Sequence, residues 1–145
     1  DLPAGSVLQV VNVESANAIN SSTDTYVDTG LTASITPTST SNKILVTICH
    51  GGCGKETGNV TLGFKVFRDS TDLGQKEGGL GYTGTTTGNL IGTWAWEYLD
   101  SPSTTSEVTY KTQFASGPGG WGTGSSAMIG WGAGKSTITL TEIAG

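Results

Sequence analysis

Three residues with metal-binding or nucleophilic side chains lie in one short segment, Cys49–Cys53, which reads CHGGC. A structural zinc site needs four Cys or His ligands, and the sequence holds two cysteines and one histidine. A Cys-His catalytic pair is also disfavoured, because adjacent residues of a strand point to opposite faces. Two hypotheses remain for His50. It is either one of three symmetry-related metal ligands on a three-fold axis or a hydrogen-bonded histidine at a strand end.

The two cysteines, four positions apart, leave two alternatives open. Cys49 and Cys53 either close a small disulfide loop across two glycines, or they are free thiols that behave as small apolar side chains. Two cysteines do not make the disulfide framework of small secreted domains.

The segment Gly130–Ser136, GWGAGKS, resembles a phosphate-binding loop. The phosphate-binding pattern needs four residues between its first glycine and the Gly-Lys-Ser/Thr triplet, and here the spacing misses by one. Such a loop must also precede a helix, whereas the residues that follow alternate like a strand. We therefore expect a glycine-rich hairpin and no nucleotide or other cofactor.

The chain has 12 acidic residues. A pair of carboxylates can cleave glycosidic bonds, so this chemistry stays open as an alternative. Most of the acids fall at predicted turns or outward strand positions, where they serve solubility. We therefore expect a protein that is not an enzyme.

Aromatic residues form two groups. Trp94, Trp96 and Tyr98 alternate along one predicted strand, so they share a face that belongs to the core or to a subunit interface. Tyr82, Trp121 and Trp131 instead lie in glycine-rich segments with few neighbours to bury them. Exposed aromatic side chains on loops suit sugar stacking or protein contact. We predict these three as ligand contacts; the alternative is that they fold back over the ends of the domain.

The elements that must position these residues are strands. Gly, Thr and Ser make up more than two fifths of the 145 residues, a composition that favours strands and tight turns. Period-two alternation predicts eight or nine strands, and no segment shows helical periodicity. We expect an antiparallel β-sandwich or jelly roll, with residues 1–5 as a junction and residues 6–145 as one domain. The predicted strands are Ser6–Val13, Tyr26–Ile35 (as one or two strands), Lys43–His50, Val60–Arg68, Leu90–Leu99, Glu107–Ala115, Ala127–Trp131 and Ser136–Ile143, and the long loops are Gly78–Gly88 and Gly117–Gly134.

Charge and hydropathy exclude two classes of partner. The net charge is −5, with one arginine and scattered lysines, which does not suit phosphate neutralisation along a nucleic acid. No stretch approaches the 18 apolar residues of a membrane-spanning helix. We therefore expect neither nucleic-acid binding nor membrane insertion.

Several ordered motifs resemble the C-terminal tip domain of tail-fibre-like virion proteins of marine and environmental phages. Together they cover most of the chain outside its glycine-rich loops. They are PAGSVLQVV at Pro3–Val11, TYVDTGLTASITPTSTSNKILV at Thr25–Val46, GFKVFRDST at Gly63–Thr71, YLDSPSTTSEVTYKTQF at Tyr98–Phe114 and STITLTEIAG at Ser136–Gly145.

The resemblance implies a homotrimeric domain on the virion surface that contacts a bacterial surface glycan or outer-membrane protein, alongside other virion proteins. It brings no catalytic residues with it. Two further classes stay open: a capsid decoration or head-fibre protein with no receptor role, and a free carbohydrate-binding module.

Overall fold

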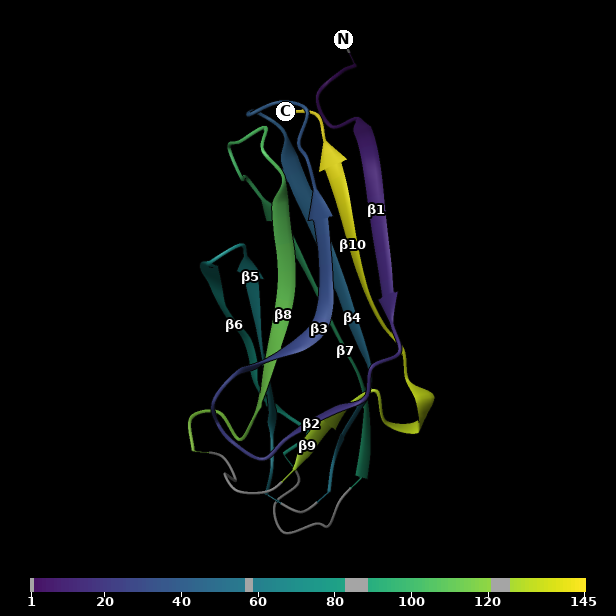
Figure 1. Cartoon of the computed structure of the whole chain (residues 1–145), viewed down its shortest axis with the longest axis vertical. Coiled ribbons are helices and arrows are strands. Elements are labelled where there is room, and N and C mark those ends of the chain that lie inside the picture. The colour runs from purple at the N-terminus through teal and green to yellow at the C-terminus, as the bar shows by residue number, and fades with distance from the viewer. Residues whose placement is uncertain (1, 57–58, 83–88, 121–125) are drawn as a thin grey trace.

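The computed structural model describes residues 2–56, 59–82, 89–120 and 126–145 (Figure 1). Within these ranges the chain forms ten strands and one short 3₁₀ turn, η1 (Trp131–Ala133), with no helix long and apolar enough to cross a membrane. The strands are β1 (Val7–Ser15), β2 (Ile19–Ser21), β3 (Val27–Ile35), β4 (Lys43–Lys55), β5 (Leu62–Arg68), β6 (Thr71–Leu80), β7 (Asn89–Asp100), β8 (Val108–Ser116), β9 (Ala127–Ile129) and β10 (Ser136–Ile143).

Two antiparallel sheets face each other. The first contains β1, β10, β4 and β7 side by side, with the short β9–β2 pair attached to the far end of β4; the second has the order β3-β8-β5-β6. When the eight long strands are counted along the chain, the sheets read 1-8-3-6 and 2-7-4-5. This interleaved order is that of a jelly roll. The expected β-sandwich or jelly-roll fold is therefore confirmed.

The core lies between the sheets and follows from alternation. In β8 the residues Val108, Tyr110, Thr112 and Phe114 are buried while the residues between them are half-exposed, because successive side chains of a strand point to opposite faces. In β4 the even-numbered residues from Ile44 to His50 point inward in the same way.

Four strand predictions need correction. Thr71–Leu80 is a strand that was not predicted, and its last three residues lie in the loop expected from Gly78. Its irregular register with β5 explains why period-two alternation is weak there. β2 is too short for alternation to reveal it. β4 continues past His50 to Lys55 through a bulge, and Trp131 belongs to η1 rather than to a strand.

The connections divide between the two ends of the sandwich. Both described ends of the chain lie at one end, where the Gly5 amide donates to the Ala144 carbonyl (2.8 Å). The strand ends that lead from β1 to β3, from β4 to β5, from β6 to β7 and from β8 to β10 all lie at the opposite end (Figure 1), which we call the loop end.

Candidate functional site

Three short elements at the loop end, β2, β9 and η1, present the exposed side chains Asn20 and Trp131. Strands β2 and β9 pair so that Asn20 lies opposite Met128 and Ile19 lies opposite Ile129. Ile129 is buried, whereas the Asn20 and Met128 side chains point away from the core. The chain then turns at Gly130 into η1, which carries Trp131.

The turn that carries Trp131 is fixed against β4 by backbone hydrogen bonds. The Gly130 amide donates to the Gly51 carbonyl (2.9 Å), and the Gly51 amide donates to the Lys135 carbonyl (3.1 Å). Gly52 has a φ of 63°, and a Cβ there would clash with the backbone of Trp131. The Trp131 side chain nevertheless remains 40% exposed. Its exposure therefore does not come from a loosely held backbone.

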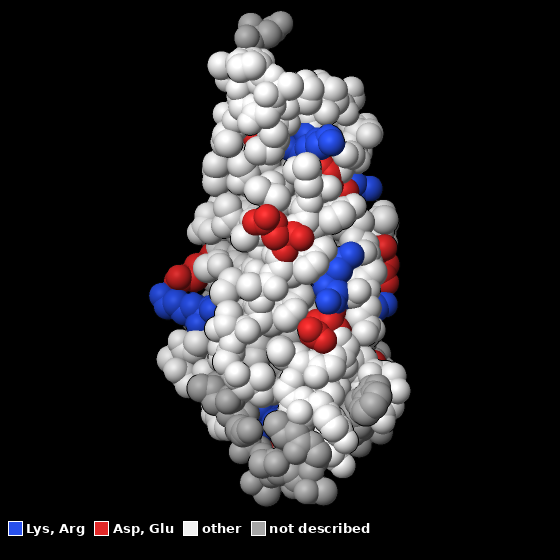
Figure 2. Space-filling model, turned by 180° about the vertical axis from the view of Figure 1, so that it is seen from behind, with Lys and Arg blue, Asp and Glu red and all other residues white. Residues whose placement is uncertain are grey.

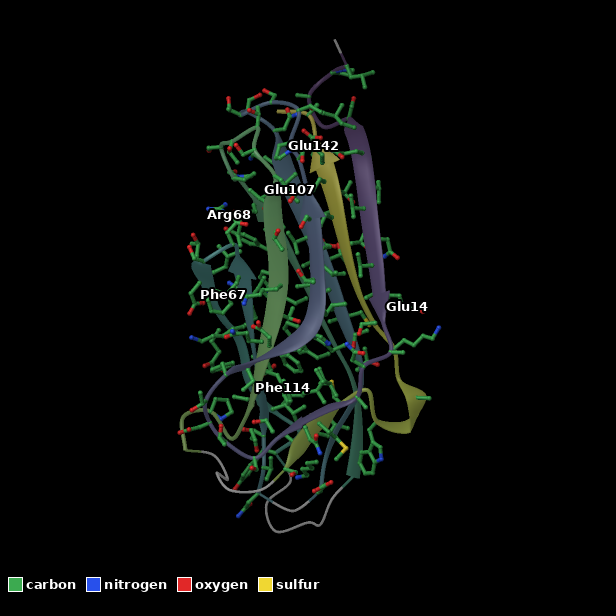
Figure 3. All side chains as sticks on the ribbon, viewed as in Figure 1. Glu14, Phe67, Arg68, Glu107, Phe114 and Glu142 are labelled. Atoms are coloured by element: carbon green, nitrogen blue, oxygen red, sulfur yellow. The ribbon has the colours of Figure 1, made fainter. Side chains whose placement is uncertain are left out.

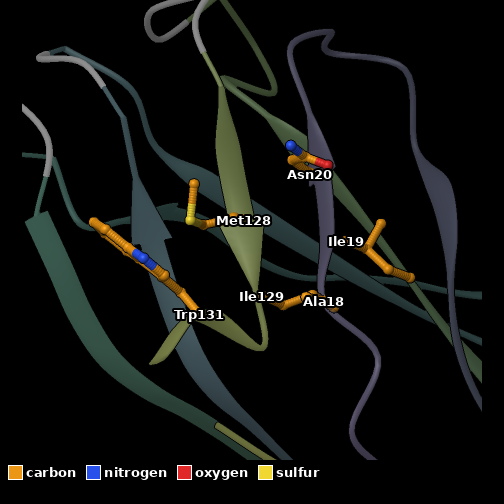
Figure 4. A pocket seen from close by; sticks show the side chains of 6 residues that line it. All are labelled: Ala18, Ile19, Asn20, Met128, Ile129 and Trp131. Carbon is orange, nitrogen blue, oxygen red and sulfur yellow. The ribbon is translucent and has the colours of Figure 1, made fainter. Parts of the chain in front are cut away.

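A pocket of about 110 Å³ lies beside this turn (Figure 4). In Figure 4 the Trp131 indole and the Asn20 amide lie on either side of β9, with Met128 between them. The pocket is lined by Ala18, Ile19, Asn20, Met128, Ile129 and Trp131. None of these residues carries a charge.

The three predicted contact residues, Tyr82, Trp121 and Trp131, do not all lie at the pocket. Trp131 lines the pocket, and Tyr82, which follows β6, is 51% exposed at the same end of the sandwich. Tyr82 is not among the pocket-lining residues. Trp121 lies outside the described residues. Asn20 and Met128 were missed by the sequence analysis, because β2 is short and nothing local pairs it with β9.

His50 is hydrogen-bonded, as the second hypothesis expected, but it lies in the core within β4 rather than at a strand end. It is fully buried, its Nδ1 lies 2.9 Å from Ser136 Oγ, and its Nε2 lies 2.9 Å from Thr112 Oγ1. The ring also stacks on Phe64 at 5.1 Å between centroids. Both ring nitrogens are engaged inside one chain, so the hypothesis of a metal shared on a three-fold axis is wrong. Burial lowers the pKa of His50 to about 4.

The cysteines do not form a disulfide. The bulge at Gly51 and Gly52 shifts the alternation of β4, so Cys53 points into the core while Cys49 shares the outward face of Leu45 and Thr47. Cys53 is fully buried, and its thiol donates to the His50 carbonyl. Burial raises the pKa of Cys53 to about 11, so this thiol is not a reactive nucleophile at neutral pH.

Two carboxylates, Asp100 and Glu142, are buried and are exceptions to the outward placement expected for most of the acids. Glu142, labelled in Figure 3, accepts hydrogen bonds from Gln9, Thr38 and Asn42. Burial alone would raise the pKa of Glu142, but these hydrogen bonds outweigh it and the pKa lies below its usual range. The bonds link the Thr38–Asn42 loop to β10 and β1. Glu142 therefore has a structural role.

The second buried carboxylate links the two sheets. Asp100 on β7 accepts from Arg68 Nη1 (2.6 Å) and from the Tyr110 hydroxyl (2.6 Å), both on the facing sheet. Burial and the bond to Asp100 raise the pKa of Tyr110. Asp100 thus ties β7 to β5 and β8, which is a structural role.

The aromatic row on β7 is part core and part surface. Trp94 is buried and stacks on Phe64 at 4.3 Å, whereas Tyr98 is 38% exposed. Lys76 of β6 lies over the Trp96 ring at 4.8 Å and over the Tyr98 ring at 5.5 Å. The expected shared face is confirmed, and Lys76 covers its outer half through cation–π contacts.

On the face that Figure 2 shows, acidic and basic side chains lie near one another in small mixed groups. On the outer face of the β3-β8-β5-β6 sheet, Lys65 pairs with Asp72 (2.8 Å) and Lys111 pairs with Asp28 (2.9 Å). Among the described residues no group of three or more His, Cys, Asp or Glu side chains is arranged to hold a metal. The fold and site thus define a jelly-roll domain with an uncharged aromatic pocket at its loop end.

Comparison with known proteins gives weak structural likeness and no family. No protein-family model and no curated protein matches the chain. Three similar structures are VP2 capsid proteins of infectious bursal disease virus: the Gx strain (TM-score 0.48, 12% identity), a D431N mutant particle (0.47, 12%) and a subviral particle (0.43, 10%). The alignments cover 93%, 94% and 93% of this chain, and 35%, 36% and 39% of those chains. This chain therefore spans little more than a third of their length, and its fold class is assigned from its own strand order.

Proposed function

We propose that this chain is a structural domain of a virus particle, and more specifically the homotrimeric tip of a phage tail fibre. Its loop end contacts a bacterial surface glycan or outer-membrane protein. The ordered motifs from Pro3 to Gly145 that resemble such tips support the family. A binding and assembly role, rather than an enzymatic one, agrees with a histidine and two carboxylates used inside the core.

The observation that carries the proposal is the separation of the two ends of the sandwich. Both described chain ends lie at one end of the sandwich. The strand ends that lead into the segments of Tyr82, Trp121 and Trp131 lie at the other end. An attachment through either chain end therefore points the loop end outward. Loops on a rigid sheet scaffold are common recognition surfaces, and three copies on one fibre add avidity.

A labelled form of the purified chain tests the proposal on a panel of marine and environmental bacteria. We expect saturable binding to at least one strain, and a loss of about tenfold or more when Tyr82, Trp121 and Trp131 are all replaced by Ala, since aromatic anchors dominate binding surfaces. Tyr98→Ala, which removes an exposed aromatic from the side of the sandwich, is the matched control and should bind normally. Normal binding by the triple variant would contradict the assignment of the loop end as the surface that contacts the cell.

Two alternatives predict different partners. A capsid decoration or head-fibre protein binds virion components and no cells. A free carbohydrate-binding module is a monomer, and the uncharged pocket beside Trp131 is the observation that favours it. Solution mass separates the module from the fibre tip.

A further inference from the structure

We infer that the pocket between β2, β9 and η1 is a subsite for one neutral pyranose ring, which stacks on Trp131 and hydrogen-bonds to the Asn20 amide. This inference deepens the proposed function, on which it rests, by naming the ligand class and the residues that contact it.

Trp131 has a fixed backbone and an exposed side chain. Ordering a mobile segment on binding costs free energy and so weakens the complex. A segment that is already held in its bound conformation avoids this cost. Trp131 leaves a turn whose backbone is bonded to Gly51 and packed against Gly52. On its other side, a Cβ on Gly130 would clash with the Asn17 carbonyl, so this turn also packs directly on the segment before β2. The indole thus projects from a fixed base while 40% of its surface stays in water.

A polar side chain, Asn20, lines the same pocket as the Trp131 indole. Asn20 is exposed, and among the residues that the structure describes its side-chain amide has no hydrogen-bond partner. An amide offers two donors and an acceptor, which matches the neighbouring hydroxyls of a sugar. Because β2 is paired with β9 in register, Asn20 is fixed opposite Met128 and on the same side of the pair.

The lining of the pocket carries no charged side chain. The six side chains that line the pocket are apolar or amide. A carboxylate or phosphate ligand would lose water there without gaining a charged partner, which is unfavourable. A pyranose ring has an apolar face of C–H groups and an edge of hydroxyls, so it fits an indole and an amide together. The pocket is small, at about 110 Å³, so it accommodates part of one ring of a longer glycan.

The test is an NMR titration of the purified chain with the neutral methyl glycosides of glucose, galactose, mannose and N-acetylglucosamine. We expect at least one of them to shift the Trp131 indole N–H, the Asn20 side-chain amide and the Met128 methyl signals together, with millimolar affinity. The Trp131→Ala variant should weaken that binding roughly tenfold, and Asn20→Ala should weaken it as well. Tyr98→Ala is the control with similar exposure and should bind as the wild type does.

The outcomes separate this inference from the proposed function. If none of the four glycosides moves the three signals while labelled chain still binds cells through the loop end, the sugar subsite is wrong and the fibre-tip proposal stands. If cells are not bound but a glycoside shifts the three signals, the subsite is right and the chain is a carbohydrate-binding module. Shifts that persist in both the Trp131→Ala and Asn20→Ala variants would place the sugar elsewhere and overturn the inference.

Discussion

At the residue scale, buried polar side chains are satisfied inside this chain rather than offered to a ligand. His50 uses both ring nitrogens on Ser136 and Thr112, and Glu142 accepts from Gln9, Thr38 and Asn42. Among the described residues, no buried side-chain nitrogen or oxygen lacks a hydrogen-bond partner. A satisfied buried group favours one packing of the core, because each alternative would leave it unpaired at a cost of about 1–3 kcal/mol.

His50 makes stability depend on pH. Its pKa is about 4 in the folded chain against an ordinary 6.5, so between these pH values the unfolded chain binds more protons and stability rises with pH. As pH falls from 6.5 to 4, the free energy of unfolding should drop by roughly 3 kcal/mol. Urea denaturation at steps of pH measures this change. The pH dependence should become much weaker in His50→Gln, which keeps hydrogen-bonding capacity without the titration. An equal slope in that variant would show that another group is responsible.

At the element scale, the bulge in β4 decides how the loop end is built. The bulge at Gly51 and Gly52 turns Cys53 inward and lets the turn Gly130–Gly134 approach the strand backbone directly. Bulges often re-aim side chains in this way beside binding sites. The position of Trp131 therefore depends on two glycines of a distant strand.

Substitution at Gly52 tests this dependence. Gly52→Ala adds a Cβ that clashes with the Trp131 backbone at a positive φ, and we expect a loss of roughly 2–4 kcal/mol in the free energy of unfolding. Gly132→Ala is the matched control, because Gly132 has a φ of 66° but a Cβ there would meet no other atom within 4 Å. Its cost should be about 1–2 kcal/mol from backbone strain alone. Equal costs in urea denaturation would mean that the close approach at Gly52 is unimportant.

At the scale of the whole molecule, the outer faces of the two sheets differ. The β3-β8-β5-β6 face carries two ion pairs, which would lose water in an interface. On the other sheet, β10 presents Thr137, Thr139 and Thr141 outward, and the flanking strands add Val10 (58% exposed) and Leu99 (47% exposed). Glu14, Glu97 and Lys43 also point outward from this sheet, and Glu14 pairs with Lys135 at 2.6 Å. The cross-strand row of Val10, Thr141, Leu45 and Leu99 holds none of these charges. Interface cores are depleted in charged residues, so the proposed trimer is expected to pack through this row of the second face.

Light scattering tests that expectation. The wild-type chain should show three times its 14.8 kDa mass, and the double variant Val10→Glu, Leu99→Glu should show the monomer mass, because burying two unpaired carboxylates is unfavourable. Thr32→Glu, an exposed position on the other sheet, should leave the trimer intact. A wild-type monomer would contradict the trimer itself, whereas a trimeric double variant would place the contact on another face.

Local patterns in the sequence were enough to predict the all-β class, most strand positions and the inward faces of strands such as β8, because period-two alternation is a local property of the chain. They also identified Trp131 and Tyr82 as exposed aromatics, since glycine-rich neighbours provide little cover. Only the tertiary structure placed Asn20 and Met128 beside Trp131. It also turned Cys53 away from Cys49 and buried His50 and Glu142 with their partners. These outcomes depend on strand register, on a bulge and on contacts between segments far apart in the chain, and none of these is encoded in local spacing.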